Sequence, residues 1–429
     1  MISLGKVIHS KYYLFIISCL PIFLITGPFL SDLVVSISTI LFLIYIISNK
    51  KYYIFKNYFF YFFLSFCLLI SFSSLISLNP LLSFESSLFY FRVIVFSFLI
   101  SYLINYNKIL LVYFYNVFLF CFSILIIDGY IQYIFGKNIF LIPSDYGRIA
   151  SFFGSELVLG SYLTRLFPLF FSLFLIMKKK KFDNLIMATI FILLDVLIFL
   201  TGERTAFFLL NISTIFIILL INEYKIFRLV TFLISVVIIF FISLSNDQIR
   251  NRMINKPFLN LKSQFEITDN LNLQNSQYET SIQKTIFTYE HSKIYYAAYE
   301  MFKDKPILGH GPKLFRIVCK DYKYNSNEDT CSTHPHNFYL QLLSETGLLG
   351  FFFILIALFY VFKESVLIFL KKKNASSQEI CLLGAFIITL WPLAPNGNLF
   401  NNWLMIVYFM PFGFYLNLKL HKRYQKPKN

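Results

Sequence analysis

This chain of 429 residues is short of charge. Asp, Glu, Lys and Arg together make up 14% of it, whereas 57% is hydrophobic. Soluble domains carry about a quarter charged residues, so the shortage argues against a soluble protein. Tryptophan is also scarce, with 2 residues, and 55 Phe and 29 Tyr supply nearly all the aromatic rings. We interpret those rings as lipid-facing bulk and not as an aromatic site. The composition predicts a membrane protein whose main partner is the lipid bilayer.

Acidic residues are the scarcer charge, 22 against 38 Lys and Arg, which gives a net charge of +16. The basic residues gather in short junctions between apolar runs, such as NKKYYIFK, MKKKKFDN and the C-terminal KLHKRYQKPKN. The long loop 245–335 is nearly balanced in charge by contrast. Because basic loops stay in the cytoplasm, this asymmetry places both termini inside and the long loop outside. The positive charge is a topology signal and does not indicate a nucleic-acid partner.

Apolar runs close to the ~20 residues that a bilayer requires recur along the whole chain. We expect about twelve transmembrane helices, at residues 12–28, 30–48, 57–78, 88–104, 109–135, 154–177, 184–201, 205–222, 227–245, 336–362, 378–395 and 398–418. No signal-peptide cleavage pattern follows the first run, so we interpret it as an uncleaved anchor. The expected fold is an all-α polytopic membrane protein in three parts. Residues 1–244 hold helices 1–9, residues 245–335 form a periplasmic loop, and residues 336–429 hold helices 10–12 and a basic cytoplasmic tail.

The long loop also has a pattern of its own. Residues 284–303 show the spacing of an amphipathic helix, which the breakers Pro306 and Gly309 should end. The preceding stretch, 255–282, is rich in Asn, Gln and Ser, and we expect a solvated excursion there. The loop is therefore predicted to be a small helical cap over the outer membrane face.

Cysteine is scarce as well, with 6 residues. Four of them lie in or beside apolar runs and are expected to be small core residues: Cys19, Cys67, Cys121 and Cys381. Cys319 and Cys331 both lie in the external loop, where an oxidising compartment permits a disulfide, although spacing alone does not establish one. A zinc site formed with His334 and His336 is the less favoured alternative, because the chain lacks paired C-x-x-C or H-x-x-x-H spacing there.

The stretch HNFYLQLLSETGLLG, His336 to Gly350, begins where the loop meets the next apolar helix. A histidine at that boundary would meet the headgroup of a lipid-borne substrate, although a polar helix-start residue is the simpler interpretation. At about 100° per residue, Glu345 lies opposite His336 and should not orient its imidazole. Gly347 and Gly350 fall below the histidine on the same face. They would form a smooth groove for a lipid chain or allow close helix–helix packing.

This stretch also resembles a known family. His336-Asn337, nine residues, Gly347, two residues and Gly350 match the signature H-[NSQ]-x9-G-x-x-G of the O-antigen ligases. DKPILGHGPKLFR, TGERTAF and GRIASFFGSELVLGSYLTRLFPL are similar to three further segments of the wider ligase and polymerase superfamily. The four segments follow the family order over roughly residues 145–350, all on the predicted outer face.

The resemblance implies a glycosyltransferase with a GT-C-like fold that needs neither metal nor cofactor. Such enzymes lie in the bacterial inner membrane with the active site on the periplasmic face. They move a glycan from undecaprenyl diphosphate to lipid A–core with inversion. By motif, His336 would activate the acceptor hydroxyl and Arg204 would bind the diphosphate.

One departure from the family concerns a second cation. The family usually has an arginine near the start of the cap helix, where this chain has EHSKIYY. Lys293 is the nearest cation, but it lacks the bidentate fork of arginine. Arg316, or Arg250 and Arg252 at the start of the loop, are the alternatives.

Further charges lie at or near membrane depth, where they normally face a polar cavity or pair with one another. Four residues of the family-like segments are candidates for lining the donor cavity: Arg148, Glu156, Arg165 and Asn337. A structural salt bridge is the alternative, as between Asp195 and a neighbouring arginine. Glu203 is expected either to orient Arg204 or to be a solvated junction charge.

The residues suit this chemistry on their own terms. A glycan diphosphate leaves readily once its charge is stabilised, so the enzyme needs cations and a base such as histidine. The same residues would serve a repeat-unit polymerase or a protein O-oligosaccharyltransferase, so the acceptor stays open. A secondary transporter is the alternative from another class. It is less favoured because no repeated halves are evident in the chain.

Overall fold

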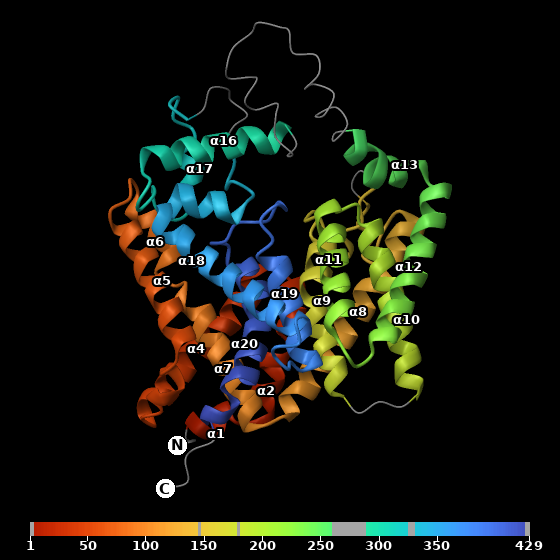
Figure 1. Ribbon diagram of the computed structural model, residues 1–429, viewed down its shortest axis with the longest axis horizontal. Coiled ribbons are helices and arrows are strands. Elements are labelled where there is room, and N and C mark those ends of the chain that lie inside the picture. The colour runs from red at the N-terminus through yellow and green to blue at the C-terminus, as the bar shows by residue number, and fades with distance from the viewer. Residues whose placement is uncertain (1–3, 145–146, 178–180, 260–288, 325–330, 425–429) are drawn as a thin grey trace, which may run out of the picture.

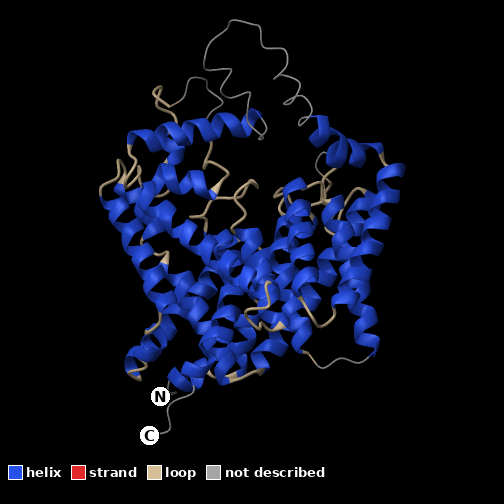
Figure 2. Ribbon diagram, viewed as in Figure 1, coloured by secondary structure: helices blue, strands red, loops and turns tan. Residues whose placement is uncertain are grey.

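The computed structural model describes residues 4–144, 147–177, 181–259, 289–324 and 331–424. Within these ranges the chain is helical and contains no β-strand (Figure 2). The predicted all-α class is therefore confirmed for the described part of the chain.

Nine helical segments are long and apolar enough to cross a membrane, counted over the described ranges. They are α4 (Pro28–Ser48), α5 (Tyr58–Leu75), α6 with α7 (Pro80–Ser87 and Phe91–Tyr106), α8 (Ile109–Phe135), α9 (Leu159–Ile176), α10 (Lys181–Leu200), α12 (Lys225–Ser245), α18 (Phe338–Phe369) and α20 (Asn402–Tyr424). Three shorter apolar segments are α2 with α3 (Lys11–Ser18 and Leu20–Ile25), α11 (Arg204–Leu220) and α19 (Ser377–Thr389). The total of twelve spans stays a prediction.

The two ends of the molecule differ in their elements (Figure 1). α1 (Leu4–Ile8) and the end of α20 lie at one end. α13 (Asp247–Arg250), α16 (Tyr289–Asp304) and α17 (Phe315–Val318) lie at the other. The beginning and end of the described chain thus share one face, and the long loop occupies the opposite one. That the loop face is periplasmic remains a prediction from the charge pattern.

α9 lies at the centre of the helical bundle. It is buried along almost its whole length and packs against α8, α10, α11, α19 and α20. Its large apolar residues, from Leu166 to Leu175, suit such a position. The start of α9 is therefore held firmly in the bundle, and the turn between α10 and α11 packs against it.

A buried ion pair joins α10 and α12. The guanidinium of Arg228 donates two hydrogen bonds to Asp195, of 2.8 and 2.9 Å, and a third to Thr214. This confirms the predicted pairing of Asp195 with a neighbouring arginine. The Arg228 side chain is fully buried in this pair.

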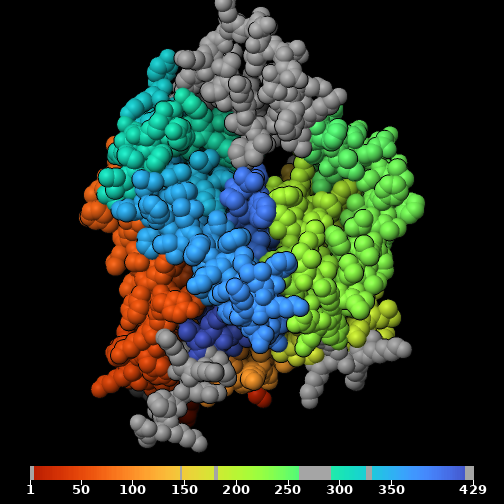
Figure 3. Space-filling model, in the orientation of Figure 1, coloured from red at the N-terminus to blue at the C-terminus, as the bar shows by residue number. Residues whose placement is uncertain are grey.

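The long loop contributes a compact cap (Figure 3), in which α16 and α17 lie over one end of α18. The amphipathic helix expected at 284–303 is confirmed over 289–303, and residues 284–288 lie outside the described ranges. Its apolar side packs with α17 through Ala297, Met301 and Phe315. Part of the expected excursion at 255–282 is helical instead, over residues 255–259, and the remainder also lies outside the described ranges.

Candidate functional site

Two of the family-like segments are held together by their main chains. PILGHG lies beside SETGLLG, and four main-chain hydrogen bonds connect them: Leu348 N to Pro306 O (2.8 Å), Leu349 N to Ile307 O (3.3 Å), His310 N to Ser344 O (3.1 Å) and Gly311 N to Glu345 O (2.8 Å). These bonds use main-chain groups that would otherwise be unsatisfied at a break in α18. They attach the loop to the helix that follows His336.

Glycine is required where the two segments cross. Gly347 has φ 65° and interrupts α18, and a Cβ there would lie 2.3 Å from the carbonyl carbon of Ile307. A Cβ on Gly309, which has φ 65°, would lie 2.3 Å from the carbonyl carbon of Glu345. The expectation of one groove formed by Gly347 and Gly350 beneath His336 is wrong, because α18 is not one continuous helix.

Glu345 supports this crossing and does not contact His336. Its carboxylate accepts hydrogen bonds from Phe315 N (3.0 Å) and from Gln341 Nε2 (3.0 Å). Gln341 in turn donates to Asn398 Oδ1 at 2.7 Å. The expected separation of Glu345 from His336 holds, but helical phase is not the reason, because His336 has φ 56° and precedes α18, which begins at Phe338. The residue joins α17, the start of α18 and the segment before α20.

His336 lies among other imidazoles on the short segment that precedes α18. Its Nε2 is 3.2 Å from Ser332 Oγ. Its ring centroid is 4.1 Å from that of His334 and 5.7 Å from that of His291, which comes from α16. The His336 main chain has φ 56°, and its carbonyl accepts a hydrogen bond from Asn396 N at 2.9 Å. Three stretches of chain therefore determine where this histidine lies: its own segment from Ser332, α16, and the segment around Asn396.

Both histidines of the segment have a lowered pKa, which favours the neutral imidazole. Burial lowers the pKa of His336 below its ordinary value, and the charge of His291 acts in the same direction. Burial lowers the pKa of His334 to about 3, with a further contribution from His336. A neutral imidazole can accept a proton at neutral pH, which is the requirement for a general base.

Asn337 starts α18. Its side-chain oxygen accepts hydrogen bonds from Tyr339 N (2.9 Å) and Leu340 N (3.2 Å), and its amide nitrogen donates to Pro392 O (2.9 Å). Such N-caps favour Asn, Asp and Ser. Asn337 was expected to line the donor cavity, but its amide is engaged in beginning the helix next to His336. The position therefore orients the histidine through the main chain.

The predicted disulfide between Cys319 and Cys331 is confirmed, with 5.3 Å between the two Cα atoms. The bond ties the end of α17 to the segment that carries His336. It also removes the alternative of a zinc site, because both thiols are consumed in the bond. No group of three His, Cys, Asp or Glu side chains within the described ranges could hold a metal ion.

The two loop cations predicted to bind diphosphate lie on the same side as His336. Arg316 belongs to α17, and its charge acts on both His334 and Glu345. Its Nε is buried without a hydrogen-bond partner among the described residues. Lys293 is a buried residue of α16. The pattern EHSKIYY predicted a role for Lys293 and none for His291. His291 has no distinguishing pattern in the sequence, and only its short distance to His336 identifies it.

Arg204 is the first residue of α11, and Arg252 follows α12 and α13. The Nε of Arg204 donates to the main-chain carbonyl of Arg252 at 2.9 Å, and the Nε of Arg252 donates to that of Gly202 at 3.2 Å. Arg250 forms an ion pair with Asp247. Of the two arginines proposed at the start of the loop, Arg252 is the one that meets Arg204.

Glu203 has neither of its expected roles. Its carboxylate accepts hydrogen bonds from Gly160 N (2.7 Å), Ser161 N (3.0 Å) and Ser161 Oγ (2.7 Å) at the start of α9. Burial raises its pKa, and these hydrogen bonds oppose the rise. The residue anchors the α10–α11 turn to the central helix and so positions Arg204 indirectly.

The remaining cavity candidates are separated in space. Arg165 is buried in α9 with its guanidinium over the ring of Tyr408, 4.8 Å from the centroid. Glu156 is exposed. Arg148 remains near Arg204, because its charge acts on that side chain. Of these candidates, Arg148 is therefore the one grouped with Arg204.

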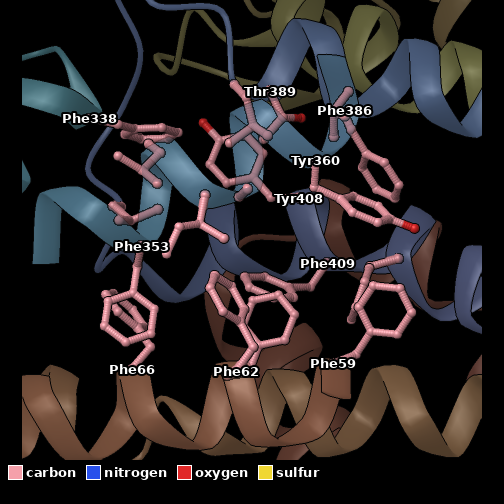
Figure 4. A pocket seen from close by; sticks show the side chains of 18 of the residues that line it. Phe59, Phe62, Phe66, Phe338, Phe353, Tyr360, Phe386, Thr389, Tyr408 and Phe409 are labelled. Atoms are coloured by element: carbon pink, nitrogen blue, oxygen red, sulfur yellow. The ribbon is translucent and has the colours of Figure 1, made fainter. Parts of the chain in front are cut away.

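An aromatic cavity of about 390 Å³ lies between α5, α18, α19 and α20 (Figure 4). Rings from α5 face rings from α18 and α20 across it: Phe59, Phe62, Phe66, Phe338, Phe353 and Tyr408. The composition indicated that the aromatic rings are lipid-facing bulk. These rings instead line a cavity. Sequence gave no signal for the cavity, since the phenylalanines are distributed over distant helices. Such a wall suits a hydrocarbon chain and not a charged headgroup.

The histidines and the arginines form two groups at the same end of the molecule. α16, α17 and the start of α18 lie on one side of that end, and α11 and α13 lie on the other (Figure 1). No hydrogen bond or ion pair links His336 to Arg204 in the described part of the chain. The predicted base and the predicted phosphate-binding arginine thus do not touch one another, which leaves a substrate to connect them.

Residues 187–355 match the family model described as O-antigen ligase. The matched region contains Arg204, His336 and the loop between them, and ends shortly after the glycine crossing. No curated protein matches the chain.

Proposed function

We propose that this chain, whose residues 187–355 match the O-antigen ligase family model, transfers a glycan from undecaprenyl diphosphate to lipid A–core. The observation that carries the proposal is the family match, whose range includes both the His336 group and Arg204. Lipid-linked glycans are the substrates that the family implies. The identity of the acceptor, lipid A–core, is the more specific part of the proposal.

His336 has the properties of the base. Its segment is held by the Cys319–Cys331 disulfide, by the hydrogen bond from Asn396 and by the Asn337 cap. A base that is fixed before the substrate arrives loses little freedom in the reaction, which favours catalysis. Its lowered pKa supports the neutral form that the chemistry requires.

In the proposed step, the acceptor hydroxyl oxygen attacks the anomeric carbon and passes its proton to the imidazole of His336. The bond from that carbon to the diphosphate oxygen breaks, and the diphosphate leaves with the electron pair. Arg204 offsets the charge that develops on the leaving group. Attack from the face opposite the diphosphate inverts the anomeric centre. Arg316 and Lys293, from the two elements packed near His336, are the further cations proposed to contact the donor.

The test is transfer in proteoliposomes with a labelled undecaprenyl-diphosphate glycan. Wild type, His336→Ala and Arg204→Ala are compared, with His9→Ala as the matched control. His9 lies between α1 and α2, against Tyr106, at the end of the molecule opposite His336. We expect label on lipid A–core with wild type and with His9→Ala, and its loss in the two site variants.

Other products would change the conclusion. Lengthening of the carrier-linked glycan would replace the ligase assignment with a polymerase. Label on protein would indicate a protein O-oligosaccharyltransferase. Full activity of both His336→Ala and Arg204→Ala would overturn the assignment of the site.

A further inference from the structure

Ser332 contacts the imidazole of His336 directly. Its Oγ lies 3.2 Å from Nε2 of His336, which comes four residues later in the same segment. The contact engages one ring nitrogen and leaves the other open. Nδ1 of His336 makes no hydrogen bond within the described ranges, and it is not fully buried. Nδ1 is therefore the nitrogen that a substrate can reach.

His334, the neighbouring imidazole, offers no such nitrogen. Its Nδ1 lies 2.9 Å from Thr333 Oγ1, and its Nε2 is buried without a hydrogen-bond partner among the described residues. The centroids of the two rings are 4.1 Å apart, so both imidazoles belong to the same site. Of the two, His336 is the one with an open ring nitrogen, and that nitrogen is Nδ1.

The main chain holds Ser332 and His336 in place. Cys331, which precedes Ser332, is bonded to Cys319 at the end of α17. The carbonyl of His336 accepts a hydrogen bond from Asn396 N at 2.9 Å, and His336 has φ 56°. A left-handed φ in a residue other than glycine persists only where surrounding contacts hold it. The hydroxyl is thus placed against the ring before any acceptor binds.

The direction of this hydrogen bond decides which ring nitrogen carries the proton. A neutral imidazole has one proton, on Nδ1 or on Nε2, and the other nitrogen has the lone pair. If Ser332 Oγ accepts from Nε2–H, the lone pair is on the open Nδ1. If Oγ donates to Nε2, Nδ1 is protonated and neither nitrogen is available. A general base needs an available lone pair, so the first arrangement is the one that suits His336 as the base.

We propose that Ser332 is a positioning residue that holds His336 in the Nε2–H tautomer, so that Nδ1 is the atom that takes the proton of the acceptor hydroxyl. This inference rests on the proposed function for the role of His336. The proton passes to Nδ1 while the hydroxyl oxygen bonds to the anomeric carbon and the diphosphate leaves with the electron pair. The imidazolium keeps its hydrogen bond from Nε2–H to Ser332 and later releases the Nδ1 proton to water. Ser332 neither gains nor loses a proton.

The first test compares Ser332→Ala with Thr333→Val, a matched control that removes the hydroxyl beside the other imidazole. A hydrogen bond from a charged donor is stronger than one from a neutral donor, so loss of Ser332 Oγ destabilises the imidazolium. We expect kcat of Ser332→Ala to fall about tenfold or more, with KM within twofold. The pKa of His336 should decrease, so the acid limb of the pH profile should move to lower pH. Thr333→Val should change none of these quantities.

Ser332→Thr keeps the hydroxyl and guards against a loss of activity through misfolding. It should recover most of the wild-type kcat and return the acid limb to its wild-type position. Movement of the limb to higher pH in Ser332→Ala would show that Oγ donates to Nε2, which would overturn the inference. An unchanged kcat in Ser332→Ala, or a kcat in Ser332→Thr as low as in Ser332→Ala, would also overturn it.

A spectroscopic measurement separates this inference from the proposed function. Histidine-labelled protein in nanodiscs gives ¹⁵N spectra at about pH 8, above the ordinary pKa of histidine, and the signals that His336→Gln lacks identify the His336 nitrogens. We expect a protonated Nε2 and an unprotonated Nδ1, with this preference weakened in Ser332→Ala. The opposite tautomer would overturn the inference even with transfer intact. The expected tautomer in a protein that transfers glycan to no acceptor would support the positioning by Ser332 and reject the assigned reaction.

Discussion

The surroundings of His336 favour its proposed role as a base. They also predict how the transfer rate depends on pH. Burial, and then the charge of His291, lower its pKa, so the neutral base persists to lower pH than for an ordinary histidine. The rate of transfer should fall as pH decreases, with a midpoint below the ordinary value of about 6.5. The pH dependence of kcat/KM, measured in proteoliposomes, checks this. A midpoint above pH 7 would contradict it.

His291→Gln refines the same prediction. The substitution removes the like charge but leaves His336 buried, so the pKa of His336 should rise and the acid limb should move to higher pH. His9→Gln is the control, since His9 lies at the other end of the molecule, and it should leave the limb in place. An unchanged limb in His291→Gln would mean that the two imidazoles do not interact in solution.

The crossing at Gly309 and Gly347 constrains how closely the main chain of the loop packs against α18. Gly347→Ala combines a left-handed φ with a contact to the Ile307 main chain, whereas Gly136→Ala has φ 73° in open space. We expect Gly136→Ala to cost about 1–2 kcal/mol of stability, the price of the backbone conformation alone. Gly347→Ala should cost clearly more, because two main chains must separate. Thermal unfolding in detergent compares the two, and equal Tm values would argue against the crossing.

The Cys319–Cys331 bond gives a second prediction at the scale of elements. It fixes the segment Ser332–His336 to α17, and a loop of this size is stabilised by about 3 kcal/mol on cross-linking. Cys319→Ser with Cys331→Ser should therefore lower the transfer rate while leaving the membrane helices intact. Cys67→Ser is the control, a buried free cysteine of α5. Unchanged transfer in the double variant would show that the disulfide does not hold His336.

The sequence predicted elements better than contacts. Hydropathy located helices in the apolar runs, but the phase argument for Glu345 and His336 assumed a helix from residue 336, whereas α18 begins at Phe338. The argument from helical phase also failed beyond Gly347, because the positive φ of this residue interrupts the regular helical periodicity. The meeting of Arg204 with Arg252 could not be predicted uniquely, because it depends on how two distant turns pack.

The whole molecule is arranged with two distinct ends, and the charge pattern predicts which end faces the cytoplasm. Single cysteines in a background without the free native cysteines test this in intact cells. Tyr322→Cys is on the exposed cap, with 89% of that residue accessible. Lys50→Cys lies in the basic junction after α4. An impermeant maleimide should label the first before lysis and the second only after it. The opposite order would invert the topology.

At the same scale, the histidine and arginine groups lie on two sides of one end of the molecule without touching. A donor would have to bind on the arginine side with its anomeric carbon toward His336. This account separates binding from chemistry, because substitutions on the arginine side should weaken donor binding and a substitution at His336 should slow the reaction itself.

The most direct test is the single-turnover rate of glycan transfer from undecaprenyl diphosphate to lipid A–core by His336→Gln. General-base catalysis accounts for about a hundredfold or more in rate, so we expect a loss of at least that size with donor Kd within twofold of wild type. A variant that transfers at the wild-type rate would contradict the central role of His336.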